Sequence, residues 1–178
     1  MKLILHDNRR YVLRFDKGDE AIEGLAQFAE QEKINAAAFW GIGAAQGTTL
    51  SYYDLNQKKY QDKELNERLE IASLIGNVAT MRDTPSVIPA KAGIQMQQSL
   101  DPWIPPPPGY GRAGQSEDDN MGKVVIHAHG SFSDKEMKVV AGHVKRLVVS
   151  ATCEIFLTAM DGKLEREYSE EIGLNLLK

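Results

Sequence analysis

Helical spacing occurs in only one stretch of this chain, whereas apolar and β-branched segments recur along the rest of it. Asp19 is a plausible N-cap, and apolar residues then return every three or four positions as far as Lys33. The other patterned segments alternate or run continuously apolar, which is typical of strands. They are residues 11–15, 34–38, 48–55, 58–65, 69–79, 124–132, 148–159 and 164–172. We therefore expect an α+β fold, with a largely antiparallel sheet of about seven strands and one main packed helix.

Turn residues predict how some of these strands are joined. Asn56-Gln57 separates two strand-like segments and predicts a hairpin, and Asp161-Gly162 is a strong hairpin signal near the C-terminus. Gly41, Gly43 and Gly47 follow neither dinucleotide-binding nor P-loop spacing. These glycines favour a tight bend or a close backbone approach over phosphate binding.

Composition and charge narrow the function classes. A chain of 178 residues is about one domain, and we treat 1–178 as a single domain. The net charge of −4 gives no electrostatic support for binding a polyanion such as DNA. No apolar run is long enough to span a bilayer, and Asp7 is too early for a secretory signal, so we expect a cytoplasmic protein without a membrane partner. The single cysteine, Cys153, lies in an apolar strand segment and is interpreted as a buried thiol more than a nucleophile.

One segment departs from the composition of the rest. Residues 84–122 contain all seven prolines and show no periodicity, so we expect a disordered insertion between two strands. The wording of 85–95 and 99–105 resembles the translated text of a dispersed palindromic repeat found in some bacterial genomes. On that resemblance the insertion is accidental. The alternative is a proline-rich recognition loop that uses polyproline II structure and Trp103.

Three of the four histidines fall within seventeen residues, and they are the strongest candidates for chemistry. Strand alternation places His127 and His129 on one face, with Ala128 on the other. A turn region then separates them from Gly142-His143, a spacing that lets the chain fold back and bring the third imidazole to the pair. Three nitrogen ligands with one position left open is typical of a reactive zinc site. The alternative is that the strand histidines are structural and are satisfied by backbone carbonyls.

Four motifs, in this order along the chain, resemble the PPC domain, the plant and prokaryote conserved family. They are Leu69–Asn77, His127-Ala128-His129, Gly142-His143 and Ala151–Ile155. The resemblance covers nearly everything outside 84–122. It implies an antiparallel sheet with a packed helix, a homotrimer and, as in prokaryotic members, a divalent metal, usually zinc.

The same resemblance assigns roles to particular residues. It implies that His127, His129 and His143 are the metal ligands and that Glu154 is a partner near the metal or an acid/base residue. Plant members also carry an AT-hook for the DNA minor groove, but its arginine-glycine-arginine-proline core does not occur here.

Two functions follow from these residues as hypotheses. The first is a trimeric, metal-binding PPC-domain module of the kind predicted to bind DNA or to regulate, whose biochemical activity the sequence does not state. The alternative is a zinc-dependent hydrolase or lyase that acts on a small substrate at the three-histidine site.

Overall fold

The computed structural model describes residues 1–82 and 122–178, which form eight strands and one α-helix. The elements, in chain order, are β1 (Lys2–Asp7), β2 (Arg10–Asp16), α1 (Ala21–Gln31), β3 (Ala37–Asp54), β4 (Lys59–Met81), β5 (Val124–Ser133), β6 (Val139–Ala159), β7 (Glu165–Ser169) and β8 (Leu174–Leu177). The α+β prediction is confirmed, with eight strands in place of about seven.

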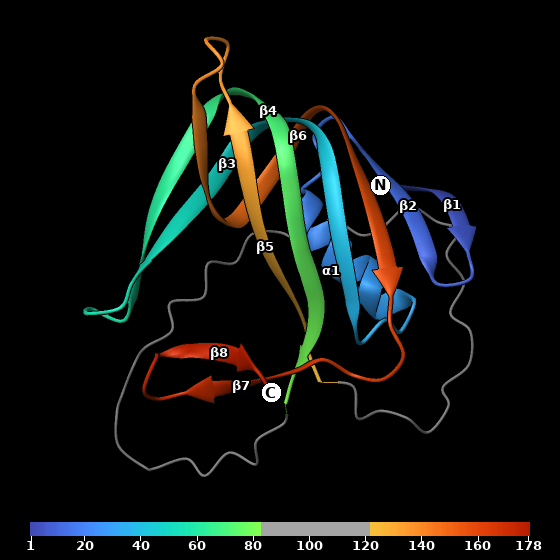
Figure 1. The fold of residues 1–178 in the computed structure, drawn as a ribbon. Helices are drawn as coiled ribbons and strands as arrows, with labels where there is room; N and C mark the ends of the chain where they lie inside the picture. The colour runs from blue at the N-terminus through green and yellow to red at the C-terminus, as the bar shows by residue number, and fades with distance from the viewer. Residues whose placement is uncertain (83–121) are drawn as a thin grey trace, which may run out of the picture. The chain divides into compact units, whose positions relative to one another are not determined.

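The strands belong to one mixed sheet in the order β1-β2-β6-β3-β4-β7-β8 (Figure 1). Strand β5 lies off this path and pairs with both β4 and β6. Strand β3 also pairs with both β4 and β6, so β3, β4, β5 and β6 form a closed ring of antiparallel pairings. The only parallel pairing in the described part of the chain joins β4 to β7.

Helix α1 covers one face of this sheet and contributes to a single core. Leu25 on the helix and Phe15, Leu147 and Ile155 on the strands are completely buried. Cys153 is also completely buried on β6, which confirms its interpretation as a packed strand thiol. The large apolar residues of the sheet's inner face therefore meet the apolar stripe of the helix, as the two periodicities require.

Glu20, and not Asp19, caps the N-terminus of α1. The Glu20 carboxylate accepts hydrogen bonds from the backbone nitrogens of Ile22 (3.1 Å) and Glu23 (2.7 Å), which have no partner inside the helix. It also accepts one from the backbone nitrogen of Leu147 on β6, at 2.7 Å. The longer glutamate side chain thus joins the helix start to the sheet, and the prediction of Asp19 as N-cap was wrong.

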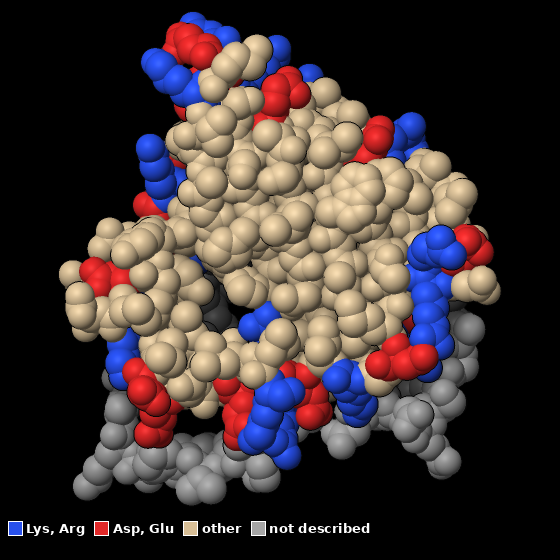
Figure 2. Space-filling model, in the orientation of Figure 1, with Lys and Arg blue, Asp and Glu red and all other residues tan. Residues whose placement is uncertain are grey.

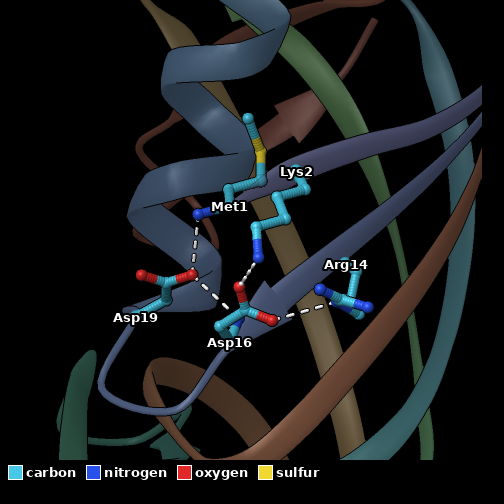
Figure 3. A network of polar contacts seen from close by, with 5 residues as sticks. All are labelled: Met1, Lys2, Arg14, Asp16 and Asp19. Carbon is cyan, nitrogen blue, oxygen red and sulfur yellow. Dashed lines mark hydrogen bonds and ion pairs between the residues drawn. The ribbon is translucent and has the colours of Figure 1, made fainter. Parts of the chain in front are cut away.

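Asp19 instead belongs to a polar network that holds the N-terminal strands to the chain before α1 (Figure 3). Its carboxylate accepts hydrogen bonds from the Met1 amino group (2.7 Å) and from the backbone nitrogen of Asp16 (2.9 Å). The Asp16 carboxylate in turn pairs with Lys2 (2.8 Å) and Arg14 (2.9 Å). These two cations, Lys2 above all, hold the pKa of the Asp16 carboxyl below its usual value.

The long strands β3 and β4 differ from the shorter segments expected from sequence. Their hairpin turns at Asn56-Gln57 as predicted, where the Asp54 carboxylate accepts from both turn nitrogens. Gly43 allows β3 to stay paired with β6 through the glycine-containing stretch in which we expected a bend or a close backbone approach. A Cβ there would lie 2.2 Å from the carbonyl oxygen of Thr152, so only glycine permits this approach of β3 to β6.

The C-terminal strands pair differently from the prediction. Asp161-Gly162 does not connect a hairpin, because β7 leaves β6 and pairs in parallel with β4, through Thr80 and Met81. Strand β8, which the pattern did not reveal, then pairs with β7. The resulting β7–β8 hairpin lies at the end of β4 (Figure 1).

The predicted insertion at 84–122 lies, except for its last residue, outside the described residues. On either side of it, the backbone nitrogen of Met81 donates to the carbonyl of Lys123 at 2.9 Å, so the chain leaves and re-enters the sheet at neighbouring points. In the described ranges, no helix has both the length and the apolar character that crossing a membrane requires.

Candidate metal centre

Strand β5 presents the first two histidines side by side. His127 and His129 alternate with the fully buried Ala128, as the strand pattern predicts, and their ring centroids are 5.2 Å apart. His127 is half-buried, whereas His129 is exposed. The core residue between them fixes which face the imidazoles occupy.

The third histidine arrives through the pairing of β5 with β6. His143 lies opposite His129, and its ring centroid is 5.4 Å from that of His129 and 5.2 Å from that of His127. One ring nitrogen from each residue lies within 4.8 Å of the other two. A Cβ at Gly142 would lie 3.2 Å from the carbonyl oxygen of Ser51, so the glycine before His143 lets β6 approach β3 closely. The structure therefore brings all three predicted ligands together.

The chemistry of these donors suits a divalent transition metal. The Nδ1 atom of His143 is buried and has no hydrogen-bond partner in the described part of the chain. Burial, reinforced by the neighbouring histidines, lowers the pKa of His143 to about 4, and burial also lowers the pKa of His127. Both imidazoles are therefore neutral at pH 7, with lone pairs available, and imidazole nitrogens are ligands that zinc accepts.

Sequence reasoning missed a cation that borders the cluster. Arg166 on β7 is almost completely buried, and its Nη2 contacts the Nδ1 atom of His127 at 3.1 Å and the Oδ1 atom of Asn77 at 2.9 Å. Asn77 lies opposite His127 in the β4–β5 register. No local signal identifies Arg166, because it is one of several charged residues in 164–172 and only the β4–β7 pairing carries it to the histidines.

A pocket of about 390 Å³ opens beside two of the histidines. Its walls come from β4, β5, β6 and the β7–β8 hairpin, and they are Tyr60, Val125, Ile126, His127, His143, Arg166, Tyr168, Gly173, Leu174, Asn175 and Leu176. Tyr60 is in contact range of the cluster, with its ring centroid 5.3 Å from that of His143. The candidate metal site is thus open to a space of ligand size.

Glu154 lies outside this group of side chains. It pairs with Ile42 on β3 and Arg14 on β2, so β3 and β4 separate it from the histidines of β5. Within one subunit Glu154 is thus not a neighbour of the histidines of β5 in the sheet, and its predicted role near the metal stays a prediction.

The fourth histidine, His6, is far from the cluster in the sequence, and its strand β1 pairs only with β2 among the described strands. His6 lies on the edge strand β1, where its ring stacks on Tyr11 at 4.3 Å and its Nε2 contacts the carbonyl oxygen of Asn8. It is therefore a suitable control residue for experiments on the other three.

Solved structures of similar proteins come from bacteria and archaea. A candidate DNA-binding protein from Ralstonia eutropha JMP134 is 25% identical, with a TM-score of 0.72, and the match covers 98% of this chain and 94% of that one. A metal-containing protein from Archaeoglobus fulgidus is 26% identical, with a TM-score of 0.69 and coverage of 100% and 99%. A plant- and prokaryote-conserved (PPC) protein from Pyrococcus horikoshii is 25% identical, with a TM-score of 0.69 and coverage of 100% and 97%.

The sequence also matches a family model. None of the curated proteins matches the chain. The model of the Plants and Prokaryotes Conserved (PCC) domain matches residues 5–96 and 111–161. The gap in this match, at 97–110, falls within the segment predicted to be an insertion. Because the matched residues make up most of the chain and include all three histidines, this protein is a member of the Plants and Prokaryotes Conserved domain family.

Proposed function

We propose that this protein is a metal-binding module that holds one zinc ion per chain through His127, His129 and His143. The observation that carries the proposal is the convergence of one ring nitrogen from each of the three histidines within 4.8 Å of one another. The buried Nδ1 atom of His143, which has no hydrogen-bond partner among the described residues, also supports it. The metal-containing relative from Archaeoglobus fulgidus supports it. Zinc would supply Lewis acidity at a position that the three imidazoles leave open.

We further propose that the protein is a homotrimer assembled through the exposed apolar face of the sheet. Phe156, Trp40, Ile75 and His129 are consecutive cross-strand partners on β6, β3, β4 and β5. Trp40 and Ile75 are each at least half exposed, and Trp40 stacks on Phe156 at 4.1 Å. Figure 2 shows a broad area over these strands without Lys, Arg, Asp or Glu side chains. Such a patch marks an interaction surface in a soluble domain.

The role in DNA binding or regulation rests on the description of the Ralstonia relative. With a net charge of −4, this chain offers phosphates little attraction, so any DNA affinity should be weak and non-specific. The second candidate function is a zinc-dependent hydrolase or lyase. The pocket beside His127 and His143 favours it, because an enzyme needs room for a small substrate next to the metal.

Metal analysis tests the proposed centre. Protein purified without added metal, incubated with equimolar zinc at neutral pH and desalted should retain about one zinc per chain by elemental analysis. His127→Ala, His129→Ala and His143→Ala should each lose stoichiometric zinc, whereas His6→Ala should retain it. Circular dichroism of the metal-free variants would show that the fold is intact. If the wild-type protein retains no zinc, the histidines are structural and the hydrolase candidate falls with the centre.

A further inference from the structure

Arg166 is a buried cation without an anionic partner. Its side chain is 6% exposed, and no carboxylate of residues 1–82 or 122–178 forms an ion pair with it. Its three acceptors are all uncharged: the carbonyl oxygen of Asn175 (2.9 Å), the Oδ1 atom of Asn77 and the Nδ1 atom of His127. Its Nε atom is buried and has no partner at all within the described residues. A buried charge without a counter-charge is costly, and none is present among the described residues, so the guanidinium is suited to bind an anionic ligand.

The pocket that Arg166 borders has the chemistry of a carboxylate site. Val125, Ile126, Leu174 and Leu176 supply apolar walls, and among the described lining residues Arg166 is the only formally charged side chain when the histidines are neutral. Two tyrosines complete it, at positions 60 and 168. In Figure 2 a hollow is visible between the sheet and the β7–β8 hairpin. Apolar walls around one guanidinium match a ligand with a small apolar body and one carboxylate group, because arginine binds carboxylates in a planar, two-bond geometry.

A bound metal ion would add positive charge beside Arg166 and would therefore favour an anionic ligand further. Three neutral imidazoles do not neutralise any of the charge of a divalent cation, which would add to the charge of the guanidinium nearby. His127 also cannot keep its contact with Arg166 when it is a metal ligand. Ligation through Nδ1 uses the lone pair that now accepts from Arg166, and ligation through Nε2 leaves Nδ1 carrying a proton. In either case an Nη2 N–H of Arg166 loses its acceptor and becomes available to a ligand.

We propose that the pocket beside the three histidines binds a small carboxylate, held by the Arg166 guanidinium and lying next to the metal. This inference deepens the proposed metal function, because the metal-loaded centre is the state in which the guanidinium is free and the positive charge is greatest. It assigns Arg166 as a binding residue for the ligand, and it identifies the ligand class of the site as an apolar monocarboxylate.

The probe is 4-fluorobenzoate, observed by ¹⁹F NMR line broadening with zinc-loaded and metal-free protein measured separately. The wild-type protein should bind it, more tightly when zinc is loaded, and should not bind the uncharged analogue 4-fluorobenzamide. Arg166→Met should weaken binding by about tenfold or more, as expected for loss of a charged hydrogen-bond donor, and Arg166→Lys should restore part of it. The control is Arg82→Met, which removes an arginine that is 47% exposed and pairs with Glu167 near the same hairpin.

The outcomes separate this inference from the metal proposal. Arg166-dependent binding in the metal-free protein would support the pocket even if no zinc were retained. Retained zinc without Arg166-dependent binding in either form, or equal binding of the amide, would overturn the carboxylate site and leave the metal centre standing. If Arg166→Met does not fold, Leu176→Trp decides, since Leu176 is 41% exposed at the pocket and a larger side chain there should block the probe. Unchanged binding by Leu176→Trp would then refute the proposal.

Discussion

Replacing Ile75 with lysine should dissociate the trimer while leaving the subunit folded. Ile75 is 57% exposed in the single chain, so a substitution there disturbs little within the subunit, about 0.5 kcal/mol or less. It is a cleaner target than Trp40, whose removal would also uncover Phe156. In the proposed assembly, however, Ile75 lies in the middle of the apolar row that the partner subunits would cover.

The size of the effect follows from the exposed fraction. Complete burial of an isoleucine side chain contributes about 1.5–3 kcal/mol, so covering the 57% that is still exposed contributes about 0.9–1.7 kcal/mol per subunit. For three subunits the loss is about 3–5 kcal/mol, before the cost of desolvating the lysine ammonium group. The association constant should therefore fall by a factor on the order of 10² to 10⁴.

Sedimentation velocity and light scattering across a concentration series measure this change. The wild-type protein should have a trimer mass at micromolar concentration, and Ile75→Lys should shift to monomer with a similar melting temperature of the monomer fold. Ile4→Lys is the matched control, because Ile4 is 55% exposed on the edge strand β1, away from the row. A wild-type monomer would refute the trimer. A trimer that survives Ile75→Lys, or one that Ile4→Lys also dissociates, would refute this face as the interface.

Four further predictions concern other parts of the molecule. Replacing residues 84–121 with a short glycine-serine turn should leave the melting temperature equal or slightly higher, because doubling the length of a loop costs only ~0.6 kcal/mol in closure entropy and Met81 is already hydrogen-bonded to Lys123. A fall of several degrees would contradict this. Cys153 should not react with a thiol reagent at pH 8 until the protein is denatured, because burial, together with Glu154, raises the pKa of its thiol to about 12; rapid labelling of native protein would count against it. Zinc should be released on acidification, because protons compete with the metal for the imidazole lone pairs, and zinc content that does not change with pH down to 4 would count against a three-histidine centre. Binding to double-stranded DNA should be weak and should decline steeply with salt, so that sub-micromolar, sequence-dependent binding at physiological salt would overturn the electrostatic reasoning.

Local sequence patterns were sufficient to predict the properties that depend on one strand or one helix alone. Alternation around Ala128 predicts that His127 and His129 share a face, and the structure confirms it, because side-chain direction in a strand repeats every two residues whatever the strand pairs with. The burial of Cys153 and the position of helix α1 follow for the same reason. The cap of that helix was harder, since Glu20 is preferred to Asp19 through its bond to Leu147, a residue 127 positions away.

Tertiary structure decided which of these faces meet. The meeting of His143 with His129 depends on the β5–β6 register, and the approach of Arg166 to His127 depends on the parallel pairing of β7 with β4, which no turn signal announces. The strong turn residues Asp161-Gly162 even predicted the wrong partner strand. A turn restricts only the local path of the chain, whereas strand partners are selected by how much apolar surface the whole sheet buries. For the same reason the local pattern around Glu154 was correctly interpreted as a strand but did not reveal that β3 and β4 lie between it and the two histidines of β5.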